Sequence, residues 1–151
     1  PYIGRRAAPP VPLDVALRQL DLFEAAGVEP HRVALGHVCC LDDPKATVAI
    51  ALARRGAFVG FDRVTLSGII PDEARVVMAT ALIDAGYATQ LLLSSDFAVE
   101  DALTRNGGPG LAQTATVFAP MLLAAGVPED TVQQILVDNP RRFLAFVPIS
   151  N

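Results

Sequence analysis

Cysteine is scarce in this chain, and its placement narrows what the chain can be. The two cysteines, Cys39 and Cys40, are adjacent in sequence. Adjacent cysteines are poorly placed to bridge each other with ordinary disulfide geometry, so we expect no disulfide framework. They also lack the paired spacing of a structural zinc site. We interpret them as buried, reduced side chains beside a strand, with a ligand or reactive role as the alternative.

Basic residues and long apolar runs are also in short supply. Lys45 is the sole lysine, and 12 Lys+Arg against 16 Asp+Glu give a formal net charge of -4. An acidic molecule without a basic stripe repels polyanions, so we expect no nucleic-acid partner. The apolar runs fall short of the about 20 residues needed to cross a bilayer. The arginines near the N-terminus are not followed by the apolar stretch of a signal peptide. We therefore expect no membrane partner and a cytoplasmic location.

The chain is rich in what a packed core needs. Of its 151 residues, 52% are hydrophobic and 19% are charged, which is far from the composition of a disordered chain. One globular domain is expected over residues 13–147. Residues 1–12 carry four prolines and no clear period, so they are expected to form an irregular lead-in, and residues 148–151 a tail.

Helix signals recur along the domain. Four amphipathic stretches end on a glycine, the residue on which helices commonly finish. These glycines are Gly27, Gly56, Gly86 and Gly126. The predicted helices cover residues 13–26, 43–55, 71–86, 111–125 and 128–137. The first should bury one face bearing Leu13, Ala16, Leu17, Leu20 and Phe23. The second should begin with Asp43 as its cap and Pro44 at its first helical position. The fifth should stop before Asn139 and Pro140.

Short apolar runs separate these helices. They cover residues 32–36, 57–61 and 90–94 and are apolar on both faces. A strand with one wet face would alternate, so these runs indicate parallel strands covered by helices. Alternation of such strands with helices predicts an α/β fold built from right-handed βαβ units.

Each predicted strand finishes on a polar or ionisable side chain. These residues are His37, then Asp62 with Arg63, then Asp96. The carboxyl ends of parallel strands share one rim, so these groups can converge although they are distant in sequence.

Each of these residues has a functional and a structural interpretation. His37 can coordinate a transition metal or shuttle protons, or it can be a core histidine satisfied by a hydrogen bond. Asp96 can bind a metal or act as a base, or it can cap the turn over residues 97–101. Asp62 and Arg63 can form a mutual or cross-strand ion pair, or Arg63 can orient a substrate carbonyl or anion.

A glycine tract over residues 106–110 gives a weaker hypothesis of a different class. Its backbone amides could hold an anion, as in a nucleotide-binding domain, but it lacks the lysine and the spacing of a P-loop. A flexible loop is the better interpretation.

Taken in order, these strand ends resemble the last three strand ends of the phosphotriesterase family, within the amidohydrolase superfamily. The strings that carry the resemblance are RVALGH (32–37), RRGAFVGFDR (54–63), LLLSSD (91–96), NGGPG (106–110) and DNPRRFL (138–144). Members of that family are TIM (βα)₈ barrels. The resemblance therefore implies the C-terminal part of such a barrel: about three βα units plus closing helices.

The resemblance also implies an activity and residue roles. Family members hold two divalent metals, commonly zinc, and use a metal-activated hydroxide to cleave ester, lactone or phosphotriester bonds in small molecules. By position, His37 matches the sixth-strand metal ligand. Asp96 matches the eighth-strand ligand, which is also catalytic because it takes the proton from the attacking hydroxide. Arg63, with Asp62 beside it, matches a substrate-binding position.

The remaining metal ligands of that family have no match. In that family they are a His-x-His pair on the first strand, a carboxylated lysine on the fourth and a histidine on the fifth. This chain has no His-x-His pair, its Lys45 lies at a helix start, and residues 1–12 hold no histidine. A full barrel needs about 250 residues, and three strands cannot close one. We therefore expect an incomplete metal site with little activity in this chain alone. Unpaired sheet edges predict a homo-oligomer, or alternatively a non-catalytic assembly module that self-associates.

Overall fold

The computed structural model describes residues 13–66 and 70–145 of the chain. The lead-in expected over 1–12 and the tail expected over 148–151 lie outside the described residues. Within them, three strands form one sheet: β1 (Ala34–Leu35), β2 (Phe58–Phe61) and β3 (Leu91–Leu93). The order is β1-β2-β3 and both pairings are parallel. The predicted α/β fold with parallel strands is confirmed.

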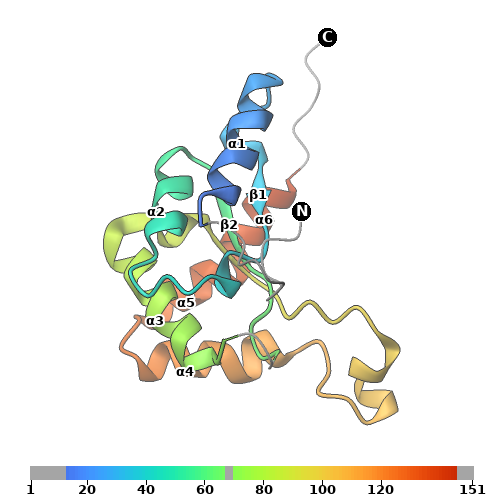
Figure 1. Ribbon diagram of the computed structural model, residues 1–151. Coiled ribbons are helices and arrows are strands. Elements are labelled where there is room, and N and C mark those ends of the chain that lie inside the picture. Colours follow the sequence, from blue (N-terminus) through green and yellow to red (C-terminus); the bar gives the residue numbers. More distant parts are fainter. Residues whose placement is uncertain (1–12, 67–69, 146–151) are drawn as a thin grey trace.

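Helices fill the sequence between and after the strands (Figure 1). The α-helices are α1 (Val15–Ala25), α2 (Thr47–Arg54), α3 (Asp72–Leu82), α4 (Ala119–Ala124), α5 (Glu129–Gln133) and α6 (Asn139–Leu144). Wider π-helical turns cover Thr114–Phe118 and Gln134–Asp138, and the segment Ile83–Tyr87 after α3 is kinked at Gly86, which has φ of 89°. Short 3₁₀ turns cover Pro30–Arg32, Val38–Cys40, Ala88–Gln90, Glu100–Ala102 and Thr104–Asn106. None of the helices in the described ranges is long and apolar enough to cross a membrane.

The second helix begins later than its sequence predicts. Pro44 is not its first helical residue, because residues 43–46 make a turn in which the Ala46 amide bonds to the Asp43 carbonyl at 2.8 Å. Ala46 takes a left-handed conformation, and α2 starts at Thr47. Asp43 still caps the helix, since its carboxylate accepts the Val48 amide at 2.8 Å. The prediction that the Asp43 carboxylate caps a first-turn amide is confirmed, but the residue at the N-cap position is Ala46, and the predicted position of Pro44 was wrong.

The end of the last helical segment was also predicted wrongly. The chain stays helical through Asn139 and Pro140, which lie in the first turn of α6. A proline inside a continuous α-helix clashes with the carbonyl four residues earlier. Here the π-helical turn Gln134–Asp138 precedes it, and such a wider turn relieves that clash.

The buried face of the first helix is narrower than predicted, and the fourth predicted helix begins later. On α1, Ala16 and Leu20 are buried as expected, but Phe23 and the preceding Leu13 are exposed. The helix predicted over 111–125 has helical geometry from Gln113, and Leu111 before it is exposed. Apolar periodicity finds the inner stripe of a helix, but it does not say how wide a surface its neighbours cover.

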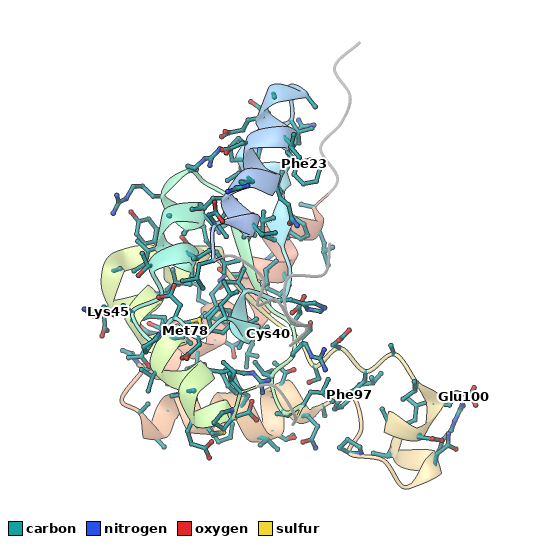
Figure 2. All side chains as sticks on the ribbon, viewed as in Figure 1. Phe23, Cys40, Lys45, Met78, Phe97 and Glu100 are labelled. Carbon is teal, nitrogen blue, oxygen red and sulfur yellow. The ribbon has the colours of Figure 1, made fainter. Side chains whose placement is uncertain are left out.

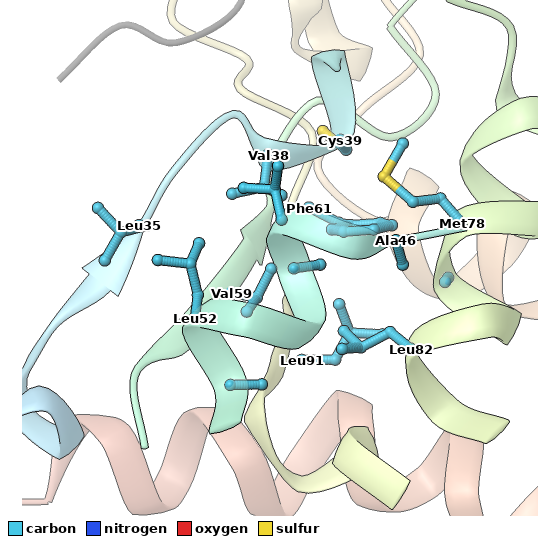
Figure 3. Packing of buried hydrophobic residues seen from close by; sticks show 14 of the residues in the cluster. Leu35, Val38, Cys39, Ala46, Leu52, Val59, Phe61, Met78, Leu82 and Leu91 are labelled. Carbon is cyan, nitrogen blue, oxygen red and sulfur yellow. The ribbon is translucent and has the colours of Figure 1, made fainter. Parts of the chain in front are cut away.

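The core lies between the sheet and the helices α2 and α3. Leu52 of α2 and Leu82 of α3 pack around Val59 of β2 and Leu91 of β3, and all four are fully buried (Figure 3). Burial of each such side chain contributes roughly 1.5 to 3 kcal/mol. This layer fixes the strands, and therefore the positions of the residues at their carboxyl ends.

Residues 97–110 leave this body as a projecting arm that carries Phe97 and Glu100 (Figures 1 and 2). The arm is held by its own backbone hydrogen bonds, among them Gly110 N–H to Ala102 O at 2.8 Å and Gly108 N–H to Leu103 O at 3.0 Å. The glycine tract is therefore part of a folded turn.

Candidate functional site

The residues singled out at the strand ends do meet at one rim of the sheet. His37 lies two residues beyond β1, Asp62 and Arg63 directly follow β2, and Asp96 lies three residues beyond β3. Because the three strands are parallel neighbours, these loops leave the sheet side by side. Two side-chain pairs join these four residues across the strands.

Asp62 holds His37 at two atoms. Its Oδ1 accepts the backbone amide of His37 at 2.8 Å and lies 2.6 Å from the ring Nδ1. An ionised carboxylate only accepts, so Nδ1 carries the proton and Nε2 is the nitrogen that can offer a lone pair. The two side chains are only 13% and 26% exposed, respectively. This arrangement fixes both the orientation and the tautomer of the imidazole.

Gly36 makes room for that contact. A Cβ atom added at Gly36 would lie 2.5 Å from Oδ2 of Asp62. No side chain fits there while the carboxylate stays against His37. A glycine directly before the histidine is therefore part of the site.

Arg63 contacts the next strand end. Its Nε lies 3.7 Å from Oδ2 of Asp96, which is an ion pair that is too long for a hydrogen bond. Asp62 and Arg63 thus form separate cross-strand pairs, with His37 and Asp96 respectively. The cross-strand alternative describes the observed contacts, and the mutual pair is not the arrangement found.

The rim loops contain unusual backbone conformations. Of the four non-glycine residues with positive φ in the described ranges, three follow the strands: His37 (62°), Thr65 (63°) and Asp96 (51°). Such conformations are uncommon outside glycine and tend to gather at functional sites.

An open pocket of about 370 Å³ lies beside Asp96. Its walls come from the segment after β3 and from the start of the helical segment at residue 114. They combine apolar side chains, such as Leu93 and Leu111, with the polar groups of Ser95, Asp96 and Thr114. Apolar walls with a few polar groups are typical of sites for small molecules.

Cys39 and Cys40 lie on the turn that follows His37. Both are buried and free, as predicted. A hydrogen bond from Cys39 lowers the pKa of Cys40 to about 7, against the effect of burial, and the positive charge of Arg63 acts in the same direction as the hydrogen bond. The same hydrogen bond, followed by burial, raises the pKa of Cys39 well above its usual range. The pair therefore has one thiol that ionises near neutral pH and one that does not.

The described residues could provide some, but not all, of the ligands of a metal site. A histidine whose second nitrogen is bound by a carboxylate is the usual form of a histidine metal ligand, and His37 has that form. Asp96 adds a carboxylate at the same rim. Within residues 13–66 and 70–145, no group of three or more His, Cys, Asp or Glu side chains could hold a metal ion together. A four-coordinate site would therefore need ligands from beyond these residues.

A further group of polar residues, beside the rim, was not predicted from the sequence. Thr65, Asp72, Arg75 and Ser95 bond to one another or to the same loop. The spacing of Asp72 and Arg75, three residues apart on a helix, was the one available signal.

Asn139 was predicted only to mark a helix end. It is fully buried, and its Nδ2 donates to the carbonyls of Ala88 and Leu91 at 2.7 and 2.8 Å. This amide ties α6 to the amino end of β3, away from the rim.

The model of the phosphotriesterase family matches residues 8–144 of this chain. The phosphotriesterase homology protein of Escherichia coli is 36% identical over 129 residues, which are 85% of this chain and 44% of that protein. Its crystal structure, with phosphate in the active site, superposes with a TM-score of 0.79, at 34% identity over 87% of this chain and 44% of that chain.

Two further relatives are enzymes by name. A lactonase from Listeria monocytogenes superposes with a TM-score of 0.80, at 27% identity over 90% of this chain and 43% of that chain. N-acetyltaurine hydrolase of Bos taurus is 32% identical over 75 residues, which are 50% of this chain and 22% of that protein.

The chain thus spans less than half the length of these relatives. The superpositions place its three parallel strands and helices on part of the TIM barrel of this metal-dependent family. The fold, the ordered strand ends and the match over residues 8–144 agree, and the chain belongs to the phosphotriesterase family.

Proposed function

We propose that this chain supplies the last three strand ends of a metal-dependent hydrolase site that acts on small ester, lactone or phosphotriester substrates. One observation carries the proposal: Asp62 holds the amide and the ring of His37, at the rim where Arg63 meets Asp96. A carboxylate-bound histidine at the carboxyl end of a parallel strand suits metal ligation. Membership in a metal-dependent family supports the same interpretation.

Each rim residue has a distinct role in this proposal. Nε2 of His37 and the carboxylate of Asp96 would hold a divalent metal, commonly zinc, which when bound activates water and polarises the substrate. Asp62 keeps His37 in the tautomer that offers Nε2. Asp96 also accepts a proton at its carboxylate. Arg63 donates to a carbonyl or phosphoryl oxygen, and the pocket beside Asp96 holds the substrate.

The proposal requires more of the barrel than these strands. Three parallel strands leave the barrel open, and the described residues provide two metal ligands at most. We expect the other ligands to come from further strands, either covalently continuous or in another chain. This chain by itself should bind zinc weakly and hydrolyse these substrates poorly. Tight binding of two zinc ions by this chain would contradict that requirement.

The test uses the two histidines of the chain as a matched pair. The 151-residue chain is mixed with the part of the E. coli relative that it does not match, and zinc retention and hydrolysis are measured. The substrates are a lactone, a phosphotriester and, because one relative is an N-acetyltaurine hydrolase, an N-acyl amide. His37→Ala should remove zinc retention and turnover. His31→Ala, at an exposed histidine, should leave both unchanged. Full zinc retention and turnover in His37→Ala would show the assignment to be wrong.

A second candidate function is a non-catalytic assembly module. It is favoured by the sheet edges, since within the described residues β1 and β3 each pair with β2 only. The same mixture separates the two candidates. A stable complex without zinc-dependent hydrolysis would favour the assembly module, and hydrolysis that depends on His37 would favour the enzyme.

A further inference from the structure

The loop that follows β2 is held in a conformation its sequence does not favour. Thr65, two residues after Arg63, has φ of 63°. A β-branched residue in the left-handed region is a genuine outlier, and it persists only where its surroundings over-determine it. The surroundings of Thr65 therefore indicate what that loop is built to do.

Two residues in the first turn of α3 hold this loop by hydrogen bonds. Both carboxylate oxygens of Asp72 lie 3.0 Å from the amide of Thr65. Arg75 donates to Asp72 Oδ1 at 2.6 Å and, through its other terminal nitrogen, to the carbonyl of Leu66 at 3.1 Å. Arg75 is 1% exposed. A buried guanidinium is costly unless it is paired, and here both of its partners serve the loop.

The same loop is tied sideways to the end of β3. The hydroxyls of Thr65 and Ser95 are 3.2 Å apart, and those of Ser95 and Thr114 are 3.1 Å apart. Backbone bonds run in parallel, with Ser94 N–H donating to Phe61 O at 3.0 Å and Val64 N–H donating to Ser94 O at 3.2 Å. Ser95 directly precedes Asp96. These ties therefore join the residues on either side of the pair Arg63 and Asp96.

We infer that Asp72, Arg75, Thr65 and Ser95 are positioning residues that set the separation of Arg63 and Asp96 at the rim. Asp72 and Arg75 hold Thr65 in its left-handed conformation. The contact of the Thr65 hydroxyl with Ser95 then fixes the position of the loop after β2 relative to the loop after β3. The inference rests on the proposed function only for the statement that Arg63 and Asp96 serve hydrolysis. The geometric part is measurable without any substrate.

The alternative is that Asp72 merely stabilises the start of α3. A Glu73 variant distinguishes this alternative from the positioning role. Glu73 is an exposed carboxylate in the same first turn, so it should interact with the helix dipole in a similar way. We expect Asp72→Ala to shift the Nε–H resonance of Arg63 and to speed hydrogen exchange of the Thr65 amide at least tenfold. Glu73→Ala should change neither. Equal effects of the two variants, or an unmoved Arg63 resonance in Asp72→Ala, would overturn the inference.

A second pair of variants covers the case in which Asp72→Ala does not fold. Thr65→Val keeps the branched shape but removes the hydroxyl, and Thr65→Ser keeps the hydroxyl. We expect Thr65→Val to shift the Arg63 Nε–H and Asp96 amide resonances and Thr65→Ser to restore both toward the unsubstituted values. If Thr65→Val and Thr65→Ser give the same spectra, the contact between the Thr65 and Ser95 hydroxyls does not position Arg63 and Asp96.

Activity in the zinc-loaded mixture distinguishes this inference from the proposed function. If Thr65→Val lowers kcat with little change in KM and Thr65→Ser restores kcat, the positioning inference and the proposed function are both supported. If the resonances move and hydrolysis is unchanged, the positioning stands and the proposed substrate role of Arg63 is wrong.

Discussion

A single carboxylate oxygen of Asp62 holds His37 at its amide and at its ring. The neighbouring Gly36 is the residue that lets the carboxylate reach this place, because a Cβ there would meet it at 2.5 Å. The strength of this arrangement can be tested at the glycine without touching either partner.

We expect Gly36→Ala to destabilise the fold by about 1 to 3 kcal/mol, the usual range for overpacking. Urea unfolding measures the change, and the imidazole ¹⁵N resonances of His37 report the loss of its Nδ1 contact. The control is the same substitution in an Asp62→Ala background, where the clashing atom is gone. An equal destabilisation in both backgrounds would mean that the glycine serves some purpose other than admitting Asp62.

The cysteine pair predicts a pH-dependent signal. The hydrogen bond from Cys39 lowers the pKa of Cys40 to about 7, so in metal-free protein thiolate absorbance near 240 nm should rise by one thiolate around pH 7. Cys39 should not ionise until well above its usual range. Cys39→Ala removes the donor and should move the first titration up toward pH 9, the ordinary value for a thiol. A first step that stays near pH 7 in this variant would rule out the hydrogen bond as the cause.

The lowered pKa of Cys40 also sets the sign of its contribution to stability. An acid with a pKa lowered in the folded state contributes stability that is fully present above its pKa in the unfolded chain and is lost as the pH falls through its pKa in the folded state. The contribution from Cys40 should therefore grow from about pH 7 toward pH 9. It is lost as the pH falls through 7.

At the scale of elements, one amide joins the last helix to the sheet. Asn139 donates to the carbonyls of Ala88 and Leu91 from a fully buried position. Without it the Ala88 carbonyl keeps the Leu91 amide as a donor, but the buried Leu91 carbonyl loses the Asn139 amide. An unsatisfied buried group costs roughly 1 to 3 kcal/mol.

We expect Asn139→Ala to lower the free energy of unfolding by at least about 2 kcal/mol, since a buried donor is lost and a cavity is left. Asn106→Ala is the matched control. The Asn106 amide also donates to a backbone carbonyl, that of Glu100 at 2.8 Å, but it is exposed, so its loss should change stability by less than about 0.5 kcal/mol. Urea denaturation of both variants checks this, and similar values for the two would contradict the proposed tie.

The elements that depend on nearby residues could be predicted from the sequence, and those that depend on distant contacts could not. The three strands and their parallel arrangement follow from apolar runs on both faces, and Asp43 was recognised as a cap because capping depends on nearby residues. The helical path through Asn139 and Pro140 was missed. It depends on a π-helical turn and on carbonyls 48 and 51 residues away, which no local pattern encodes.

At the scale of the whole molecule, the open sheet has consequences for assembly. Within the described residues β1 and β3 pair with β2 alone, and unpaired edges are templates for further strands. We expect a homo-oligomer, seen by light scattering as a mass that rises with protein concentration. Adding the complementary part of the E. coli relative should suppress this association, while an inert protein such as serum albumin should not. A monomer at all concentrations would contradict the prediction.

The sequence by itself determined the order of helices and strands and the residues that stand at the strand ends, because both follow from periodicity and from side chains close together in the chain. Only the tertiary structure decided which of those residues are partners. Asp62 could have paired with its neighbour Arg63, yet it holds His37, 25 residues away, because parallel strands bring their carboxyl ends within hydrogen-bond distance and Gly36 leaves space for the carboxylate. The unequal thiols of Cys39 and Cys40 and the grip of Asp72 on Thr65 were decided in the same way, by distances between atoms that folding alone sets.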